Sequence, residues 1–272
     1  MVNLLFQGQA RQSTLTGNIK IHEKFVSKVL GNERTLRVYL PPQYDSEPTR
    51  RFPVLYVHDG QNIFDGMTSY IPNQEWRIDE TAEALIRGKL IDPIIIVGID
   101  NAGMQRADEF LPIEVQMGKD KAGGKADLYG KFLMNEVMPW VNQTYRTQTG
   151  PQNTGLMGSS FGGVISLYLG LKHPGTFGKL GVVSPSTWIG DGYLTRFVQE
   201  LPKKTASKVW LDMGTSEGRT TLPQVRKLRD AFIARGWKEG RDFTYFEDGY
   251  AEHNEAAWAR RVGSIFMFLY RK

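Results

Sequence analysis

The segment GSSFGGVISLYLGL, residues 158–171, says more about the architecture of this chain than any other. Its first five residues fit the pattern Gly-x-Ser-x-Gly, which describes a sharp turn from a strand into a helix that exposes a serine hydroxyl. Small residues must flank such a serine because its backbone is strained, and Gly158 and Gly162 meet this requirement. The remainder is apolar almost all round, which predicts a helix buried in the middle of a domain.

A second segment, GTSEG at residues 214–218, fits the same pattern. The helical segment that follows it, residues 222–233, keeps its apolar residues in one stripe and is charged elsewhere, which is typical of a surface helix. A nucleophile turn belongs to a central strand and its buried helix. We therefore predict Ser160 as the nucleophile and place Ser216 in an ordinary strand-to-helix turn.

Composition excludes several classes of site and partner. The 272 residues contain no cysteine, so disulfides, thiol catalysis and thiolate metal sites are excluded. The net charge is +5, but the basic residues are dispersed, which favours a solvated surface over a nucleic-acid or membrane patch. No apolar run approaches the ~20 residues of a membrane span. From the dispersed charge and the lack of such a run, we expect neither nucleic acid nor a membrane as a partner.

Residues 1–17 are left out of the fold prediction. LFQG at residues 5–8 resembles the remnant of a protease site used to remove expression tags, although a native polar tail is an equal alternative. The apolar residues 4–6 are too short for a signal peptide, so none is expected in this chain. Residues 18–272 are predicted to form one domain.

The coarse pattern is that of an α/β protein. Residues 20–29 and 35–40 are expected to pair as antiparallel strands with a turn at residues 31–32. Short apolar runs then alternate with helical patterns, which indicates a mostly parallel sheet with helices on both faces. The predicted strands are residues 53–57, 93–97, 154–157, 180–183, 209–213 and 243–246, and the predicted helices are residues 78–90, 128–145 and 256–270.

A serine nucleophile needs a base, and the chain has four histidines to choose from. His22 lies within the first strand, and His173 lies more than three helical turns after Ser160 and suits a helix C-terminus. His58 precedes the nucleophile and fits a loop-holding role better. His253 follows the last strand and precedes the final helix, so we predict it as the base.

The acid of such a triad follows the serine and precedes the histidine in this fold. Glu217 fits this order and lies just after the strand 209–213, where catalytic groups of a parallel sheet collect. Asp212 is an alternative inside the strand, and Glu247 and Asp248 are alternatives at the end of the next strand. Glu217 is our prediction, against the alternative of a solvated carboxylate in a turn.

The remaining site residues follow from the chemistry of ester attack. The oxyanion needs preformed N–H donors, which we predict at Phe161, after the nucleophile, and at Gln61, after a strand and a glycine. The alternative is that the loop at Gln61 is only a turn. Trp188, with Phe64 and Trp76 as weaker candidates, could line the substrate cleft or belong to the core.

Five segments together resemble the esterase branch of the α/β-hydrolases, which includes feruloyl and acetylxylan esterases, enterochelin esterases and mycobacterial mycolyltransferases. The resemblance runs from about residue 35 to the end of the chain. The segments are VYLPP (38–42), YVHDGQNIFD (56–65), GSSFGG (158–163), SPSTW (184–188) and GTSE (214–217). One departure is EFLP at residues 109–112, where many relatives have Glu-Tyr-Thr-Pro, and this change predicts a more apolar wall beside the site.

The resemblance implies an α/β-hydrolase fold and the same site. It assigns Ser160 as nucleophile, Glu217 as acid and His253 as base, with the backbone of Gln61 and Phe161 as oxyanion hole. It also implies short acyl or aryl ester substrates of acetyl or feruloyl type, on a small molecule or a carbohydrate, and a secreted or periplasmic location. No metal and no cofactor are expected for this chemistry.

We therefore interpret the chain as a serine carboxylic ester hydrolase that forms an acyl-enzyme. One alternative is an acyltransferase that uses the same triad and passes the acyl group to an alcohol. The other is a non-catalytic binding protein on a hydrolase fold. The residues alone do not distinguish among acyl groups and give no oligomeric state.

Overall fold

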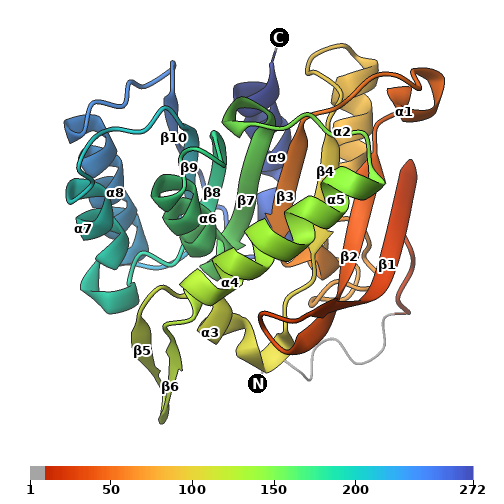
Figure 1. Cartoon of the computed structure of the whole chain (residues 1–272). Helices are drawn as coiled ribbons and strands as arrows, with labels where there is room; N and C mark the ends of the chain where they lie inside the picture. Colours follow the sequence, from red (N-terminus) through yellow and green to blue (C-terminus); the bar gives the residue numbers. More distant parts are fainter. Residues whose placement is uncertain (1–9, 272) are drawn as a thin grey trace.

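A twisted sheet of eight strands, in the order β1-β2-β4-β3-β7-β8-β9-β10, forms the centre of the molecule (Figure 1). The computed structural model describes residues 10–271. β2 pairs antiparallel with β1 and β4, and the other ladders are parallel. This confirms the predicted α/β fold. The strands are β1 (Asn18–Ser27), β2 (Asn32–Leu40), β3 (Val54–His58), β4 (Ile95–Ile99), β7 (Thr154–Ser160), β8 (Lys179–Pro185), β9 (Lys208–Gly214) and β10 (Phe243–Asp248).

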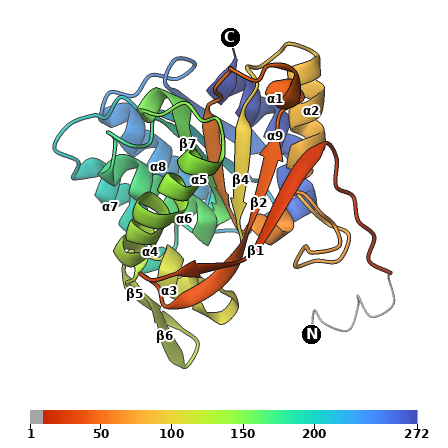
Figure 2. The same ribbon diagram turned by 45° about the vertical axis from the view of Figure 1, so that its right-hand side comes forward.

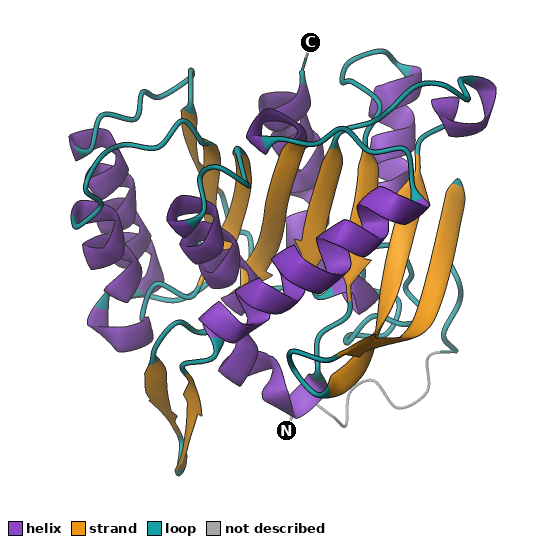
Figure 3. Ribbon diagram, viewed as in Figure 1, coloured by secondary structure: helices purple, strands orange, loops and turns teal. Residues whose placement is uncertain are grey.

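Alternate residues of each central strand face two separate cores. In β3, Tyr56 belongs to one core, and Leu55 and Val57 belong to the other. The first core lies under α3 (Arg106–Phe110), α4 (Ala126–Phe132), α6 (Phe161–Lys172), α7 (Tyr193–Gln199) and α8 (Thr221–Ala234). The second lies under α2 (Ile78–Arg87) and α9 (Glu255–Tyr270). Figure 3 shows helices in front of and behind the sheet, which makes three layers.

α6 is the buried helix that the sequence predicted. All its residues are buried except Lys172 at its end. The predicted helix 128–145 is one continuous element in which a π-helical turn, Leu133–Val137, separates α4 from α5 (Met138–Thr144). Pro139 in the first turn of α5 lacks an N–H donor and crowds the preceding turn, which accounts for the wider turn before it.

Several short elements were not predicted. They include α3, α7, the single turn α1 (Gln43–Ser46) and the hairpin of β5 (Glu114–Met117) and β6 (Asp120–Gly123). The hairpin projects from the body of the molecule (Figure 1), and most of its side chains are exposed. Each of these strands has only four residues, so the alternation in β5 is too short to be distinguished from chance, although Val115 is partly buried against the first core.

The segment before β1 packs against the domain. Thr14 N donates to Asp65 Oδ1 at 3.1 Å, Arg11 Nη1 donates to the Met67 carbonyl at 2.8 Å, and Thr16 N donates to Asp79 Oδ2 at 2.7 Å. LFQG at residues 5–8 lies outside the described residues. Within residues 10–271, no helix is both long enough and apolar enough to cross a membrane.

The close packing of α6 on β8 depends on Gly170. A Cβ atom at this position would lie 2.2 Å from Cδ2 of Leu180 and 2.9 Å from its Cγ. Such overpacking costs about 1–3 kcal/mol. We expect Gly170→Ala to lower the free energy of unfolding by about this amount in a urea titration. As the matched control, Gly175→Ala meets nothing within 4 Å and should change stability by less than about 1 kcal/mol. Equal stabilities for the two variants would contradict this account of the packing.

Candidate active site

β7 passes into α6 at Ser160, which adopts φ 57° and ψ −121°. This backbone conformation costs a non-glycine residue about 1–3 kcal/mol. Gly158 makes the sharp turn possible, because a Cβ atom there would lie 2.7 Å from the carbonyl carbon of Gly162. The turn leaves Ser160 half-buried at the wall of a pocket, with its Oγ 3.3 Å from Oγ of Ser186.

The second Gly-x-Ser-x-Gly segment has a different geometry. Ser216 is exposed, its φ is not positive, and α8 begins only at Thr221. The residue that turns inward there is Glu217, whose side chain is 1% exposed. In the first segment the serine, Ser160, lines the pocket, whereas in the second the carboxylate, Glu217, is the buried side chain.

Glu217 contacts His253 across the end of the sheet. Oε2 of Glu217 lies 2.7 Å from Nδ1 of His253, and Oε1 accepts from Ser184 Oγ at 2.5 Å and from Gly214 N at 2.7 Å. Burial by itself raises the pKa of Glu217, but the hydrogen bonds from His253 and Ser184 outweigh burial and lower it below its ordinary value. An ionised carboxylate only accepts, so Nδ1 is the donor and Nε2 is left to accept a proton.

A buried ion pair supports this carboxylate from behind. Arg261 donates through Nη1 to Asp212 Oδ1 at 2.6 Å and to Ser184 Oγ at 3.1 Å. Trp258 Nε1 also donates to Ser184 Oγ at 3.1 Å, and the hydroxyl in turn donates to Glu217. The side chains of Arg261 and Asp212 are 2% and 0% exposed, so this network is shielded from water. It fixes the position of the Glu217 carboxylate.

The other carboxylates considered for the acid are engaged elsewhere. Asp212 also accepts from Trp210 Nε1 at 2.7 Å, and burial raises its pKa to about 6 despite the charge of Arg261. Asp248 Oδ2 lies 3.6 Å from Arg261 Nε, and Glu247 pairs with Arg226 at 2.8 Å on the surface. In the described structure, Glu217 is the carboxylate that contacts His253.

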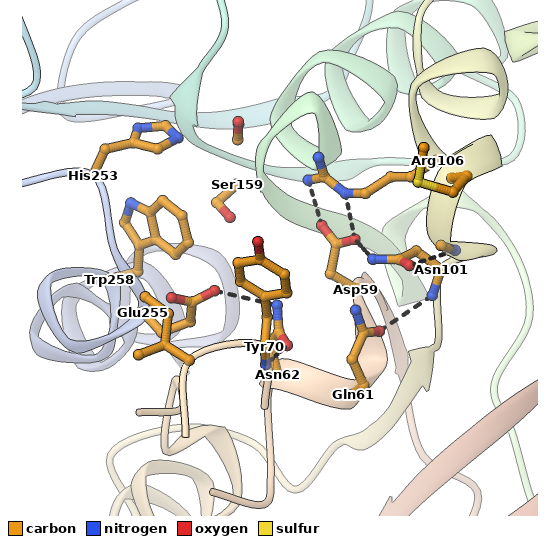
Figure 4. A pocket seen from close by; sticks show the side chains of 14 residues that line it. Asp59, Gln61, Asn62, Tyr70, Asn101, Arg106, Ser159, His253, Glu255 and Trp258 are labelled. Carbon is orange, nitrogen blue, oxygen red and sulfur yellow. Dashed lines mark hydrogen bonds and ion pairs between the residues drawn. The ribbon is translucent and has the colours of Figure 1, made fainter. Parts of the chain in front are cut away.

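A pocket of about 560 Å³ opens in front of Ser160 and His253. Figure 4 shows its walls, with His253 and Trp258 on one side and Gln61, Asn101 and Arg106 on the other. The ring of His253 stands edge-on to Trp258, with the centroids 4.9 Å apart. Tyr70 and Asn62 lie between these walls, and Glu255 lies on the side of Trp258, where it accepts from Asn62 Nδ2 at 3.2 Å. The volume is in the range of small-molecule sites.

The loop after β3 brings Gln61 to this pocket. Asp59 has φ 58° and its carboxylate accepts from Arg106 Nε and Nη2, both at 2.7 Å, and from Asn101 Nδ2 at 2.7 Å. Gly60 is required because a Cβ there would lie 2.6 Å from the backbone of Gly98. Gln61 lies in the short 3-10 helix Gly60–Asn62, and Phe161 is the first residue of α6. N–H groups in the first turn of a helix have no intrahelical acceptor, so both can meet a ligand.

The aromatic residues expected at the cleft lie in different places. Phe64 is fully buried against Tyr39, with ring centroids 6.4 Å apart, and Trp76 is 2% exposed beneath Trp258. These two side chains are core residues and contribute no surface to the pocket. Trp188 is 44% exposed and packs on Phe161 beside the pocket, with ring centroids 6.1 Å apart.

Two further expectations concern residues near the loop. The segment 109–112 was expected to make an apolar wall, but Glu109 forms a buried ion pair with Arg34 at 2.9 Å and Phe110 packs on His58. His58 is buried, its Nδ1 lies 2.9 Å from the Tyr129 hydroxyl, and burial lowers its pKa to about 4. It is therefore a neutral core residue behind the loop.

The sequence did not predict many residues of the pocket wall, among them Tyr70, Asn101, Met104, Arg106, Glu255 and Trp258. Most lie in loops or in short elements without a periodic pattern. A signal existed for Trp258 and Glu255, because residues in the first turns of a helix that directly follows His253 must lie close to it. No comparable signal marks Tyr70 or Met104.

Comparison with known proteins places the chain in a family. Residues 27–268 match the family described as "Putative esterase". The uncharacterized protein YbbA of Bacillus subtilis is 27% identical over 89% of this chain and 94% of its own length. The iron(III) salmochelin esterase of Escherichia coli is 24% identical over 76% of this chain and 48% of its own length.

Solved structures show the same fold. The BES protein of Bacillus cereus superposes with a TM-score of 0.75 at 18% identity, over 98% of this chain and 100% of that one. A ferulic acid esterase superposes with a TM-score of 0.70 at 17% identity, over 93% of this chain and 98% of that one. The chain thus belongs to the "Putative esterase" family of carboxylic ester hydrolases and has the α/β-hydrolase fold.

Proposed function

We propose that this esterase cleaves short acyl or aryl esters through a covalent acyl-enzyme on Ser160, with His253 as base and Glu217 as its partner. The observation that supports the proposal most is the 2.7 Å hydrogen bond between His253 and the buried Glu217, at a pocket whose wall carries Ser160 in a strained strand-to-helix turn. A nucleophile, a base and a group that orients the base are the parts that acyl transfer requires.

The reaction follows from these roles. Nε2 of His253 takes the proton of Ser160 as Oγ attacks the ester carbonyl, and the N–H groups of Gln61 and Phe161 stabilise the oxyanion. The imidazolium then gives its proton to the departing alcohol, which leaves the acyl group on Oγ. Water, activated by His253, releases the acid and restores Ser160. Throughout, Glu217 stabilises the positive imidazole.

The pocket wall favours an acyl group with an apolar or aromatic body and polar substituents. Tyr70, Met104 and Trp258 supply apolar surface, whereas Asn101, Arg106 and Glu255 supply a few polar groups. Feruloyl groups have this character. The names of a ferulic acid esterase and of an endo-1,4-beta-xylanase/feruloyl esterase from Xylanibacter ruminicola, 28% identical over 94% of this chain and 32% of that protein, point to the same class. A carbohydrate-linked feruloyl or acetyl ester is therefore the substrate class that we propose.

A fluorophosphonate probe tests the nucleophile and a panel of esters tests the substrate. We expect the probe to modify Ser160, located by peptide mass spectrometry, because it reacts with an activated serine. Chromogenic acyl esters of graded length, methyl ferulate and an acetylated sugar should rank the acyl groups by kcat/KM. A folded protein that neither takes up the probe nor hydrolyses any of these esters would be a binding protein on a hydrolase fold.

Ser160→Ala should lower kcat by ~10³-fold or more, because the covalent route is lost. Ser216→Ala is the matched control: it changes the serine of the other Gly-x-Ser-x-Gly segment and should retain most activity. Steady-state kinetics on one chromogenic ester measure both variants. Loss of turnover in Ser216→Ala with retention in Ser160→Ala would show that the nucleophile is misassigned.

Glu217→Gln should keep the fold and reduce kcat by roughly 10²–10⁴-fold, because the amide no longer favours the productive tautomer of His253 or its positive form. Asp248→Asn, a matched change at the end of the neighbouring strand, should have a much smaller effect. Circular dichroism checks that both variants fold. A near-wild-type rate for Glu217→Gln would instead direct attention to Asp248 or Glu247.

The dependence of kcat/KM on pH should show one ascending limb between roughly 5.5 and 7.5 and then a plateau, because an ordinary imidazole loses its proton near pH 6.5 and only the neutral base can accept one from Ser160. Hydrogen bonds hold the pKa of Glu217 below its ordinary value, so this carboxylate is already ionised across the window and adds no second limb. A flat profile under conditions where acylation limits the rate would be incompatible with this mechanism.

A further inference from the structure

Three carboxylates gather where α2 begins, apart from the residues that line the Ser160 pocket. They belong to Glu75, Asp79 and Glu80, and one oxygen from each lies within 4.8 Å of the other two. Glu75 is 5% exposed, Asp79 is 0% exposed and Glu80 is partly buried. Like charges at such distances repel one another, and burial strengthens the repulsion.

Each of these carboxylates has one oxygen with a partner and one without. Thr16 N donates to Asp79 Oδ2 at 2.7 Å, the Thr14 hydroxyl donates to Glu75 Oε1, and Arg77 Nε lies 3.2 Å from Glu80 Oε1. The remaining oxygens, Oε2 of Glu75, Oδ1 of Asp79 and Oε2 of Glu80, are buried and have no hydrogen-bond partner among the described residues. Buried oxygens without a partner are rare in proteins. Three of them in one cluster point to a positively charged ligand that all three oxygens can contact.

The protein's own cations near the cluster are exposed. The side chain of Arg77 is 66% exposed, and Arg260 borders a hollow of about 840 Å³ that Thr14, Glu75 and Glu80 also line. The hollow reaches Glu75 and Glu80, whereas Asp79 is fully buried behind them and does not line it.

We propose that Glu75, Asp79 and Glu80 bind a divalent cation of the hard class, with calcium as the preferred ion. All three donors are carboxylate oxygens, and neither imidazole nor thiolate is among them, which favours calcium or magnesium over zinc. Calcium accepts six to eight oxygens in a flexible arrangement, so water from the hollow can complete its shell. Magnesium demands a stricter octahedron, and side chains from three positions on a loop and a helix start meet that less readily.

The cation would hold Glu75 of the loop against the first turn of α2, and the hydrogen bonds from Thr14 and Thr16 would link both to the distant segment before β1. Thr14 and Thr16 belong to the segment that leads into β1, which runs along the edge of the molecule in Figure 2. Glu75 ends the loop that also carries Tyr70 of the Ser160 pocket, and Asp79 and Glu80 lie in the first turn of α2. The role of the cation is therefore to stabilise the loop that forms part of the wall of the Ser160 pocket, and it takes no part in the ester chemistry.

Terbium luminescence and calorimetry test the site on the whole chain. After treatment with a chelator, the protein should bind one Tb³⁺ with emission sensitised by tryptophan, since Trp76 adjoins Glu75 in sequence, and Ca²⁺ should displace it. At about 100 times its dissociation constant, Ca²⁺ should raise Tm by about 5 °C. Titration of Ca²⁺ in a calorimeter gives the stoichiometry. Absence of Tb³⁺ emission and of any Ca²⁺-dependent rise in Tm would overturn the proposal and leave carboxyl groups that retain protons.

Variants locate the ion. Glu75→Gln and Asp79→Asn should each weaken Ca²⁺ binding by at least ~10-fold while the chelated proteins remain folded, because each change relieves repulsion. Glu80→Gln, at the partly buried member, gives the same test if either buried variant fails to fold. Glu114→Gln, on the exposed hairpin, is the control and should bind Ca²⁺ as the wild type does. Undiminished binding in all three cluster variants would place the ion elsewhere.

The site is independent of the proposed chemistry, and one variant shows this. Ser160→Ala should bind Ca²⁺ with unchanged affinity, since Ser160 does not belong to the cluster. Loss of Ca²⁺ binding in this variant would contradict a separate site.

Discussion

The buried ion pair between Arg261 and Asp212 is the interaction on which the arrangement of the site depends. It joins α9 to β9, and through the hydroxyl of Ser184 it also reaches β8. The same hydroxyl donates to Glu217, so one network fixes the carboxylate that holds His253. Breaking such a pair by removing one partner costs roughly 3–5 kcal/mol, because an uncompensated charge remains buried. The position of the Glu217 carboxylate is thus tied to the stability of the fold.

A second constraint acts at the other side of the pocket. Ser160 keeps its strained backbone because β7 and α6 are buried and packed around it. Gly158 lets the backbone of β7 approach that of Gly162 closely at this turn. Asp59 plays the corresponding part for the loop after β3, where Arg106 and Asn101 hold a residue with positive φ. Strain at both turns is borne by rigid surroundings, which is how a preorganised site is maintained.

The central strands and α6 could be predicted because burial leaves a pattern in the residues. A strand covered on both faces must be almost entirely apolar, as β4 is and as β3 is before His58. A helix in the middle of a domain must likewise be apolar on nearly every side, as α6 is. The β5–β6 hairpin, α3 and α7 left no such pattern, because they are short and partly exposed. The same limit applies to the pocket wall, where Tyr70 and Met104 come from loops whose shape depends on contacts far away in the sequence.

By itself, the sequence determined the fold class and limited the catalytic candidates to Ser160, His253 and a few carboxylates, because chain order and strand ends leave few residues to choose from. Only the tertiary structure decided which carboxylate contacts His253, since Glu217, Asp212 and Asp248 lie near one edge of the sheet and differ in the partners that long-range packing gives them. It also decided that Phe64 and Trp76 are core residues. An aromatic side chain suits a cleft and a core equally well, and only its neighbours in space distinguish the two.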